Sequence, residues 1–224
     1  EAIAARTLVI AEAGVNHNGN LNMALKLVDV AADAGADAVK FQTFNTEKLV
    51  TRSANKANYQ KQTTGATESQ WDMLRQLELK PEFHLRLREH CEKRGIQFLS
   101  TAFDAESLTF LVDEVSVECL KVPSGEITNG PFLLAHAQTQ KNIILSTGMA
   151  TLGEVETALG VLAFGYLSWD TPALHRFQQA YASQEGQSLL RQNVTLLHCT
   201  SEYPTPAEHV NLRAMDTLAH AFGL

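Results

Sequence analysis

Short apolar runs alternate with longer segments of helical periodicity along the 224 residues of the chain. The runs occupy residues 8–14, 38–43, 97–103, 119–125, 142–148 and 194–202. Four or five consecutive apolar or small residues without polar alternation indicate strands that are buried on both faces, as in a parallel sheet. A repeated order of strand and helix predicts an α/β fold.

The segments between these runs carry helix start and stop signals. Asn20 is a typical N-cap residue and can begin the first helix. Gly35 follows the last residue of the apolar periodicity of that helix and can end it. Pro81 suits the first turn of a second helix. Thr151 and Glu154 have the spacing of a capping box at the start of a third helix.

Six strand–helix units suit either a doubly wound sheet or a barrel. Polar residues follow nearly every apolar run. A barrel enzyme places its functional residues at the ends of all its strands, whereas a doubly wound sheet gathers them at one switch point, so this distribution favours the barrel. The segment GVNHNG (14–19) also lacks the glycine spacing of a dinucleotide-binding turn. A complete barrel requires eight units. We therefore predict a (β/α)8 TIM barrel that is truncated after about the sixth unit.

Two segments do not fit plain connections between a strand and a helix. Residues 45–70 are polar and too long for a tight turn, which suits an active-site lid. Residues 165–193 indicate an added helical insertion before the sixth strand. For both segments a purely structural role is the alternative, and for the insertion we prefer it.

Charge and cysteine content exclude several classes of partner. The net charge is −7 and the pI is near 5.6, which argues against nucleic acid or an acidic membrane surface. No apolar run approaches the roughly 20 residues that span a bilayer. The three cysteines have no metal-type spacing, so we expect a reduced, cytoplasmic protein.

The ends of the predicted strands carry most of the candidate chemistry. They offer Glu12, Lys40, Gln42, Ser100, Thr101, Lys121, Ser124, Glu126, Ser146, Thr147 and residues 200–203. In a barrel these side chains converge on one mouth. Lysines, hydroxyls and backbone amides beside glycine suit the binding of a phosphate. Glu12 is positioned to act as a general base or to orient a hydroxyl.

Two histidines permit two readings each, and one cysteine permits a single reading. His198 could ligate a metal, but a hydrogen-bonded core histidine is the reading we favour. His17 could contact a substrate or simply hold the first loop in place. Cys199 has no neighbouring base in the sequence and is expected to pack in the interior.

Several of these stretches resemble the N-acetylneuraminate (sialic acid) synthase family, which includes the legionaminate and pseudaminate synthases. They are IAEAGVNHNG (10–19), ADAVKFQT (36–43), KVPSGE (121–126), LSTGM (145–149) and LHCTSEYPTP (197–206). They occur in the order of the family's motifs and with suitable spacing. The resemblance covers nearly the whole chain apart from residues 45–70 and the insertion.

The resemblance implies a barrel enzyme that condenses phosphoenolpyruvate with N-acetylmannosamine or a related N-acetylated amino sugar and releases phosphate. The positions that match phosphoenolpyruvate contacts are Lys40, Thr101, Lys121, Ser124, Ser146 and Ser201. At the position of Ser201, some members of the family have asparagine. Glu12 matches a position at the reacting carbons, and Gln42, Glu126 and Tyr203 match positions at the sugar.

The resemblance also implies a divalent metal, Mn²⁺ or Mg²⁺, held by two histidines in the seventh and eighth units. Those units and the family's C-terminal antifreeze-like domain have no counterpart in residues 1–224. We therefore expect the metal ligands to lie beyond Leu224, the 224-residue chain alone to be inactive, and the full-length protein to be a homodimer. The 1–224 segment is then one incomplete synthase barrel.

Two rival functions remain open. A desolvated Lys121 could form an imine with a carbonyl substrate, as in a Schiff-base aldolase. A non-catalytic module that binds sugar phosphates would account for the missing metal motifs.

Overall fold

The computed structural model describes residues 6–52 and 69–224. The chain divides into two compact units, Glu1–Val117 and Glu118–Leu224. Each unit contains three strands, and helices follow the strands along the chain. This alternation confirms the predicted α/β class. No helix in the described part of the chain combines the length and apolar character needed to cross a bilayer.

The first unit is built on three parallel strands. They are β1 (Ile10–Gly14), β2 (Ala38–Thr43) and β3 (Gln97–Ala102). The central strand β2 pairs with both neighbours, Ile10 with Ala38 and Ala38 with Gln97. Phe41 is fully buried, as expected for a strand covered on both sides.

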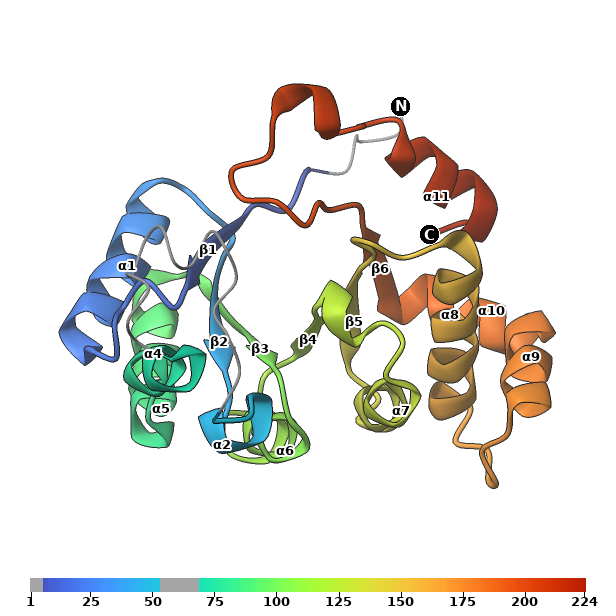
Figure 1. Cartoon of the computed structure of the whole chain (residues 1–224), viewed down its shortest axis with the longest axis horizontal. Helices are drawn as coiled ribbons and strands as arrows, with labels where there is room; N and C mark the ends of the chain where they lie inside the picture. The colour runs from blue at the N-terminus through green and yellow to red at the C-terminus, as the bar shows by residue number, and fades with distance from the viewer. Residues whose placement is uncertain (1–5, 53–68) are drawn as a thin grey trace. The chain divides into compact units, whose positions relative to one another are not determined.

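Among the described residues of this unit, five helices accompany these strands. They are α1 (Leu21–Asp33), α2 (Thr46–Leu49), α4 (Gln70–Leu77), α5 (Pro81–Arg94) and α6 (Ala105–Asp113). The Asn20 side chain accepts a hydrogen bond from the Met23 amide and caps α1, and Pro81 occupies the first turn of α5. Figure 1 shows α1 and α5 side by side, and both pack against the strands.

The second unit repeats the pattern with β4 (Cys119–Val122), β5 (Asn142–Ser146) and β6 (Val194–Leu197), again all parallel. Its helices are α7 (Gly130–Gln138), α8 (Leu152–Tyr166), α9 (Leu174–Ala182), α10 (Gln184–Asn193) and α11 (Ala214–Phe222). Short 3-10 turns lie at Ser124–Glu126 and Ala207–His209. The predicted capping box of Thr151 and Glu154 opens α8.

The insertion at 165–193 is helical, as predicted, and covers α8. Figure 1 shows α8 between α7 on one side and α9 with α10 on the other, and α8 packs against all three. Every residue of α8 from Ala158 to Tyr166 is buried as a result. A helix that is apolar on all sides requires such cover. The insertion therefore completes the hydrophobic core of this unit.

Several strands are shorter than the apolar runs suggested. The run at 119–125 forms a strand only as far as Val122, because Pro123 has no amide hydrogen to continue the ladder. The run at 194–202 forms a strand only to Leu197. The predicted lid at 45–70 begins with the short helix α2 and ends at the start of α4. Its central part, 53–68, lies outside the described residues.

Candidate active site

In the first unit, Glu12 of β1 and Lys40 of β2 form an ion pair. The Lys40 Nζ lies 2.5 Å from the Glu12 Oε2 and 3.4 Å from the Thr101 Oγ1. The Lys40 side chain is only 13% exposed, whereas that of Glu12 is 52% exposed. The ammonium therefore sits in a sheltered position with a carboxylate and a hydroxyl around it. Such a group suits an oxygen-rich, negatively charged ligand.

A bulge at the end of β1 makes room for this pair. Glu12 pairs with Lys40, but Gly14 then pairs with Phe41, so the register shifts between Glu12 and Gly14. Gly14 has φ +53°, and a Cβ there would lie 3.2 Å from the Glu12 Oε1 and 3.7 Å from the Gln42 Nε2. Glycine at position 14 therefore allows the Glu12 and Gln42 side chains to lie next to the backbone of β1.

Lys40, Gln42 and Thr101 share one face of the strands. Side chains alternate between faces along a strand, so Lys40 and Gln42 lie on the same face of β2. Gln42 pairs with Thr101 across β2 and β3. The first unit therefore brings four of the predicted site residues together, Glu12, Lys40, Gln42 and Thr101, and their roles stay predictions.

In the second unit, Lys121 forms the centre of a second group. Its side chain is buried, with the residue 8% exposed, and the Nζ donates to the Ser146 Oγ at 2.6 Å and to the Val122 carbonyl at 2.8 Å. An ammonium is costly to bury unless it is hydrogen-bonded and finds a compensating charge. The carboxyl ends of β4 and β5 thus hold a buried lysine that donates hydrogen bonds to a hydroxyl and to a carbonyl oxygen.

Ser124, Gly148 and Cys199 form a compact cluster on the three loops that follow β4, β5 and β6. The Gly148 amide donates to the Ser124 Oγ at 2.9 Å and to the Cys199 Sγ at 3.2 Å, and these two side-chain atoms are 3.0 Å apart. A Cβ at Gly148 would lie 3.0 Å from the Ser124 Oγ and 3.1 Å from the Cys199 Sγ. A larger residue at position 148 would therefore require these side chains to shift by a few tenths of an ångström.

Sequence reasoning did not predict that the Cys199 thiol contacts Ser124 and the Gly148 amide. The expectation was interior packing, whereas the thiol contacts a predicted phosphoenolpyruvate residue and a backbone amide. The only sequence signal was its position at the end of a buried run, which it shares with many structural cysteines.

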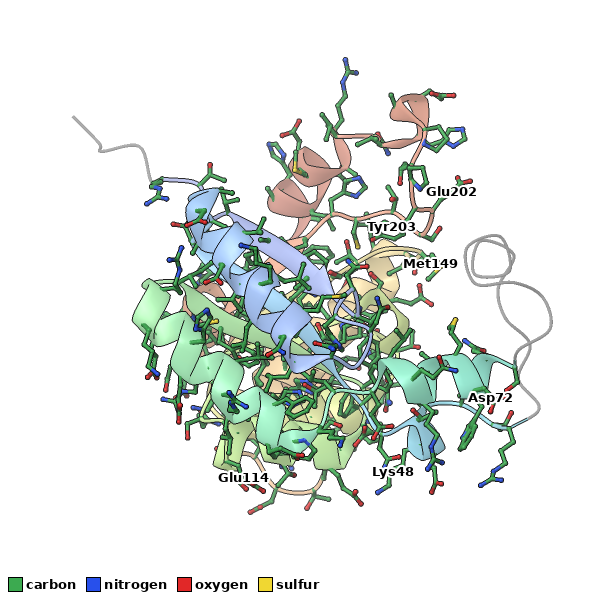
Figure 2. All side chains as sticks on the ribbon, turned by 90° about the vertical axis from the view of Figure 1, so that its left-hand side faces the viewer. Lys48, Asp72, Glu114, Met149, Glu202 and Tyr203 are labelled. Carbon is green, nitrogen blue, oxygen red and sulfur yellow. The ribbon has the colours of Figure 1, made fainter. Side chains whose placement is uncertain are left out.

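The remaining predicted residues of this unit lie on exposed or half-buried loops. The Glu126 Oε2 accepts from the Asn129 Nδ2 at 2.7 Å. Tyr203 is 72% exposed, and Ser201 is exposed too. Figure 2 shows Tyr203 with Glu202 on the segment that follows β6. A contact of Ser201 or Tyr203 with substrate stays a prediction.

The two histidines that permitted two readings both have backbone partners. The His198 Nε2 donates to the Val210 carbonyl at 2.7 Å, which agrees with the favoured structural reading. His17 is fully buried, and its Nδ1 accepts from the Gly19 amide at 3.0 Å, so it holds the loop after β1. Burial lowers the pKa of His17 from its usual value, so the ring is neutral at pH 7.

Within residues 6–52 and 69–224, no group of three His, Cys, Asp or Glu side chains is arranged to hold a metal ion. The metal expected from the resemblance is therefore not assigned to any residue of the described chain.

Parallel strands that alternate with helices along the chain, and that carry lysine and hydroxyl side chains, define an α/β protein. A family model described as the NeuB family matches residues 27–224. The chain belongs to the NeuB family.

Two characterised relatives carry the same name. The chain is 49% identical to the N,N'-diacetyllegionaminic acid synthase of Campylobacter jejuni, over 98% of this chain and 59% of that protein. It is 44% identical to the synthase of that name from Legionella pneumophila, over 96% of this chain and 55% of that protein. The chain therefore spans less than two thirds of the length of these relatives.

A solved structure shares the fold. The N-acetylneuraminic acid (sialic acid) synthetase of Leptospira borgpetersenii, crystallised with citrate, matches with a TM-score of 0.71 and 32% identity, over 95% of this chain and 61% of that chain. The spore coat polysaccharide biosynthesis protein of Bacillus subtilis matches with a TM-score of 0.68 and 30% identity, over 100% and 54% of the two chains.

Proposed function

We propose that the full-length protein condenses phosphoenolpyruvate with an N-acetylated amino sugar and releases phosphate, within a (β/α)8 barrel to which this chain contributes the first six units. The observation that carries the proposal is the buried Lys121, hydrogen-bonded to Ser146 beside the cluster of Ser124, Gly148 and Cys199. Membership of the NeuB family supports it. The name shared by the two relatives favours a sugar with two acetamido groups and the product N,N'-diacetyllegionaminic acid.

The residues divide by chemistry. Lys121, Ser146 and Ser124 supply a cation and hydroxyls, which suit the phosphate of phosphoenolpyruvate. In the other unit, Glu12 is the half-exposed carboxylate beside the Lys40 ammonium. A carboxylate beside the reacting carbon can act as the general base.

The proposed reaction joins the methylene carbon of phosphoenolpyruvate to the aldehyde carbon of the open-chain sugar, while the aldehyde oxygen takes a proton from solvent. Water then adds to the phosphate-bearing carbon and gives its proton to Glu12. The carbon–oxygen bond to phosphate breaks, which leaves a ketone and free phosphate. Binding both substrates in a fixed orientation supplies much of the rate enhancement in such a condensation.

A phosphate-release assay on the full-length protein tests this function. Phosphoenolpyruvate should be consumed only in the presence of an amino sugar, one phosphate should appear per sugar, and the di-N-acetylated sugar should react faster than N-acetylmannosamine. Mass spectrometry of the product should show the sugar enlarged by the pyruvate unit. Absence of phosphate release with every sugar tested, with and without Mn²⁺ or Mg²⁺, would contradict the proposal.

Borohydride trapping separates this function from a Schiff-base aldolase. The buried Lys121 is the observation that keeps the aldolase in consideration, because a lysine in a desolvated pocket can be the nucleophile that forms an imine. The condensation proposed here forms no imine. Incubation with pyruvate and borohydride should therefore add no mass to Lys121, and a covalent adduct at Lys121 would favour the aldolase.

A further inference from the structure

A buried chain of hydrogen bonds joins α5 to β2 and β3 in the first unit. The Ser100 Oγ lies 2.7 Å from the Thr43 Oγ1, which lies 2.8 Å from the His84 Nε2. The other ring nitrogen, His84 Nδ1, lies 3.1 Å from the Lys80 carbonyl oxygen. Ser100, Thr43 and His84 are 0%, 7% and 1% exposed. The chain is therefore shielded from solvent along its length.

Elementary hydrogen-bond chemistry assigns every proton in this chain. Burial lowers the pKa of His84 to about 4, so the ring is neutral at pH 7. A carbonyl oxygen only accepts, so the Nδ1 carries the hydrogen and donates to Lys80. The Nε2 must then accept from the Thr43 hydroxyl, and the Thr43 oxygen accepts from Ser100. Each hydroxyl has one orientation, which makes the network rigid.

The network lies directly behind two predicted site residues. Thr43 follows Gln42 on β2, and Ser100 precedes Thr101 on β3. Gln42 and Thr101 are paired across the two strands. Because side chains alternate along a strand, Thr43 and Ser100 face α5 whereas Gln42 and Thr101 face the other side. The hydrogen bonds therefore hold the carboxyl ends of β2 and β3 at the point where the site residues emerge.

We propose that His84 is a positioning residue of the active site, which acts through Thr43 and Ser100 to set the placement of Gln42 and Thr101. This inference rests on the proposed function, because Gln42 and Thr101 are assigned to the sugar and to phosphoenolpyruvate. His84 itself touches neither substrate in this assignment. Its effect is on orientation, and small displacements at a reacting centre have large kinetic effects.

Replacement of the Thr43 hydroxyl gives the sharpest test. In the full-length protein, Thr43→Val keeps the branched shape but leaves the His84 Nε2 and the Ser100 hydroxyl without their shared partner. We expect kcat/KM to fall about 10- to 100-fold for both substrates, the range seen when a reacting group is displaced by about 1 Å. Thr43→Ser retains the hydroxyl and should restore kcat/KM to within a few-fold of the original protein.

His136 provides a matched control. It is also a fully buried helical histidine, its Nδ1 also donates to the carbonyl four residues earlier, Phe132, at 2.8 Å, and burial also lowers its pKa to about 4. No predicted site residue is among the partners described for it. His136→Leu and His84→Leu should both lower the melting temperature, but only His84→Leu should change kcat/KM.

Two measurements keep the possible outcomes apart. If the original protein releases no phosphate with any sugar, the proposed function fails whatever the variants do. If it is active and Thr43→Val lowers the melting temperature while both KM values and kcat stay unchanged, the network is merely structural and the inference fails. Nitrogen-15 NMR of His84 should show hydrogen on Nδ1 and none on Nε2, and the opposite tautomer would overturn the network independently of activity.

Discussion

Lys121→Met in the full-length protein should weaken phosphoenolpyruvate binding about 30- to 5,000-fold and leave sugar binding nearly unchanged. Removal of one cationic contact to a desolvated phosphate should cost about 2–5 kcal/mol, by analogy with the loss of one partner from a buried charge pair. Each factor of ten in the dissociation constant corresponds to about 1.4 kcal/mol. Calorimetric titration with phosphoenolpyruvate and then with the sugar measures both affinities.

Lys141→Met is the control for this substitution. Lys141 lies in the same unit and is partly exposed, with its Nζ 3.9 Å from the Glu118 Oε2. Both variants keep the volume and apolar character of the lysine stem, so the melting temperatures should change little. A purely structural Lys121 would give a clear drop in melting temperature with normal phosphoenolpyruvate affinity. That result would remove Lys121 from the site.

Acidification should destabilise the protein through two buried histidines. Burial lowers the pKa of both His84 and His136 to about 4, against 6.5 for an unperturbed histidine. Between these values the unfolded chain binds more protons than the folded chain, so the free energy of unfolding falls as the pH is lowered. The stabilisation is complete above pH 6.5 and lost by about pH 4.

Each histidine should contribute about 3 kcal/mol to the free energy of unfolding at neutral pH. About 2 kcal/mol of this contribution is lost between pH 7 and pH 5. Urea unfolding at several pH values measures the effect. The double variant His84→Leu with His136→Leu should show a loss smaller by about 4 kcal/mol between pH 7 and pH 5. An identical pH dependence in the two proteins would mean that these rings are protonated in the folded state.

Local chemistry allowed the helices to be predicted from the sequence. Asn20 caps α1, Pro81 opens α5, and Thr151 with Glu154 caps α8, each as its residue type and spacing indicated. These signals depend on atoms within one turn of the chain, so no distant contact alters them.

Strand ends were harder to predict, because a strand continues only as far as the adjacent strand supplies backbone hydrogen-bond partners. Apolar composition suggested a strand to residue 125, yet β4 ends at Val122. The run at 194–202 likewise forms a strand only as far as Leu197. An apolar run indicates that its residues are buried. Residues beyond the last hydrogen bond of the strand are still buried, so the composition does not show where the strand ends.

The sequence by itself determined the α/β class, the helix caps and the residue types that the carboxyl ends of the strands present. Only the tertiary structure decided which of them meet. It brought Cys199 to within 3.0 Å of Ser124, 75 residues away, and linked His84 through Thr43 to Ser100. Contacts of this kind depend on which face of each strand and helix is turned toward its neighbours. That choice is made by the packing of the whole unit, because each element alone presents several faces of similar free energy.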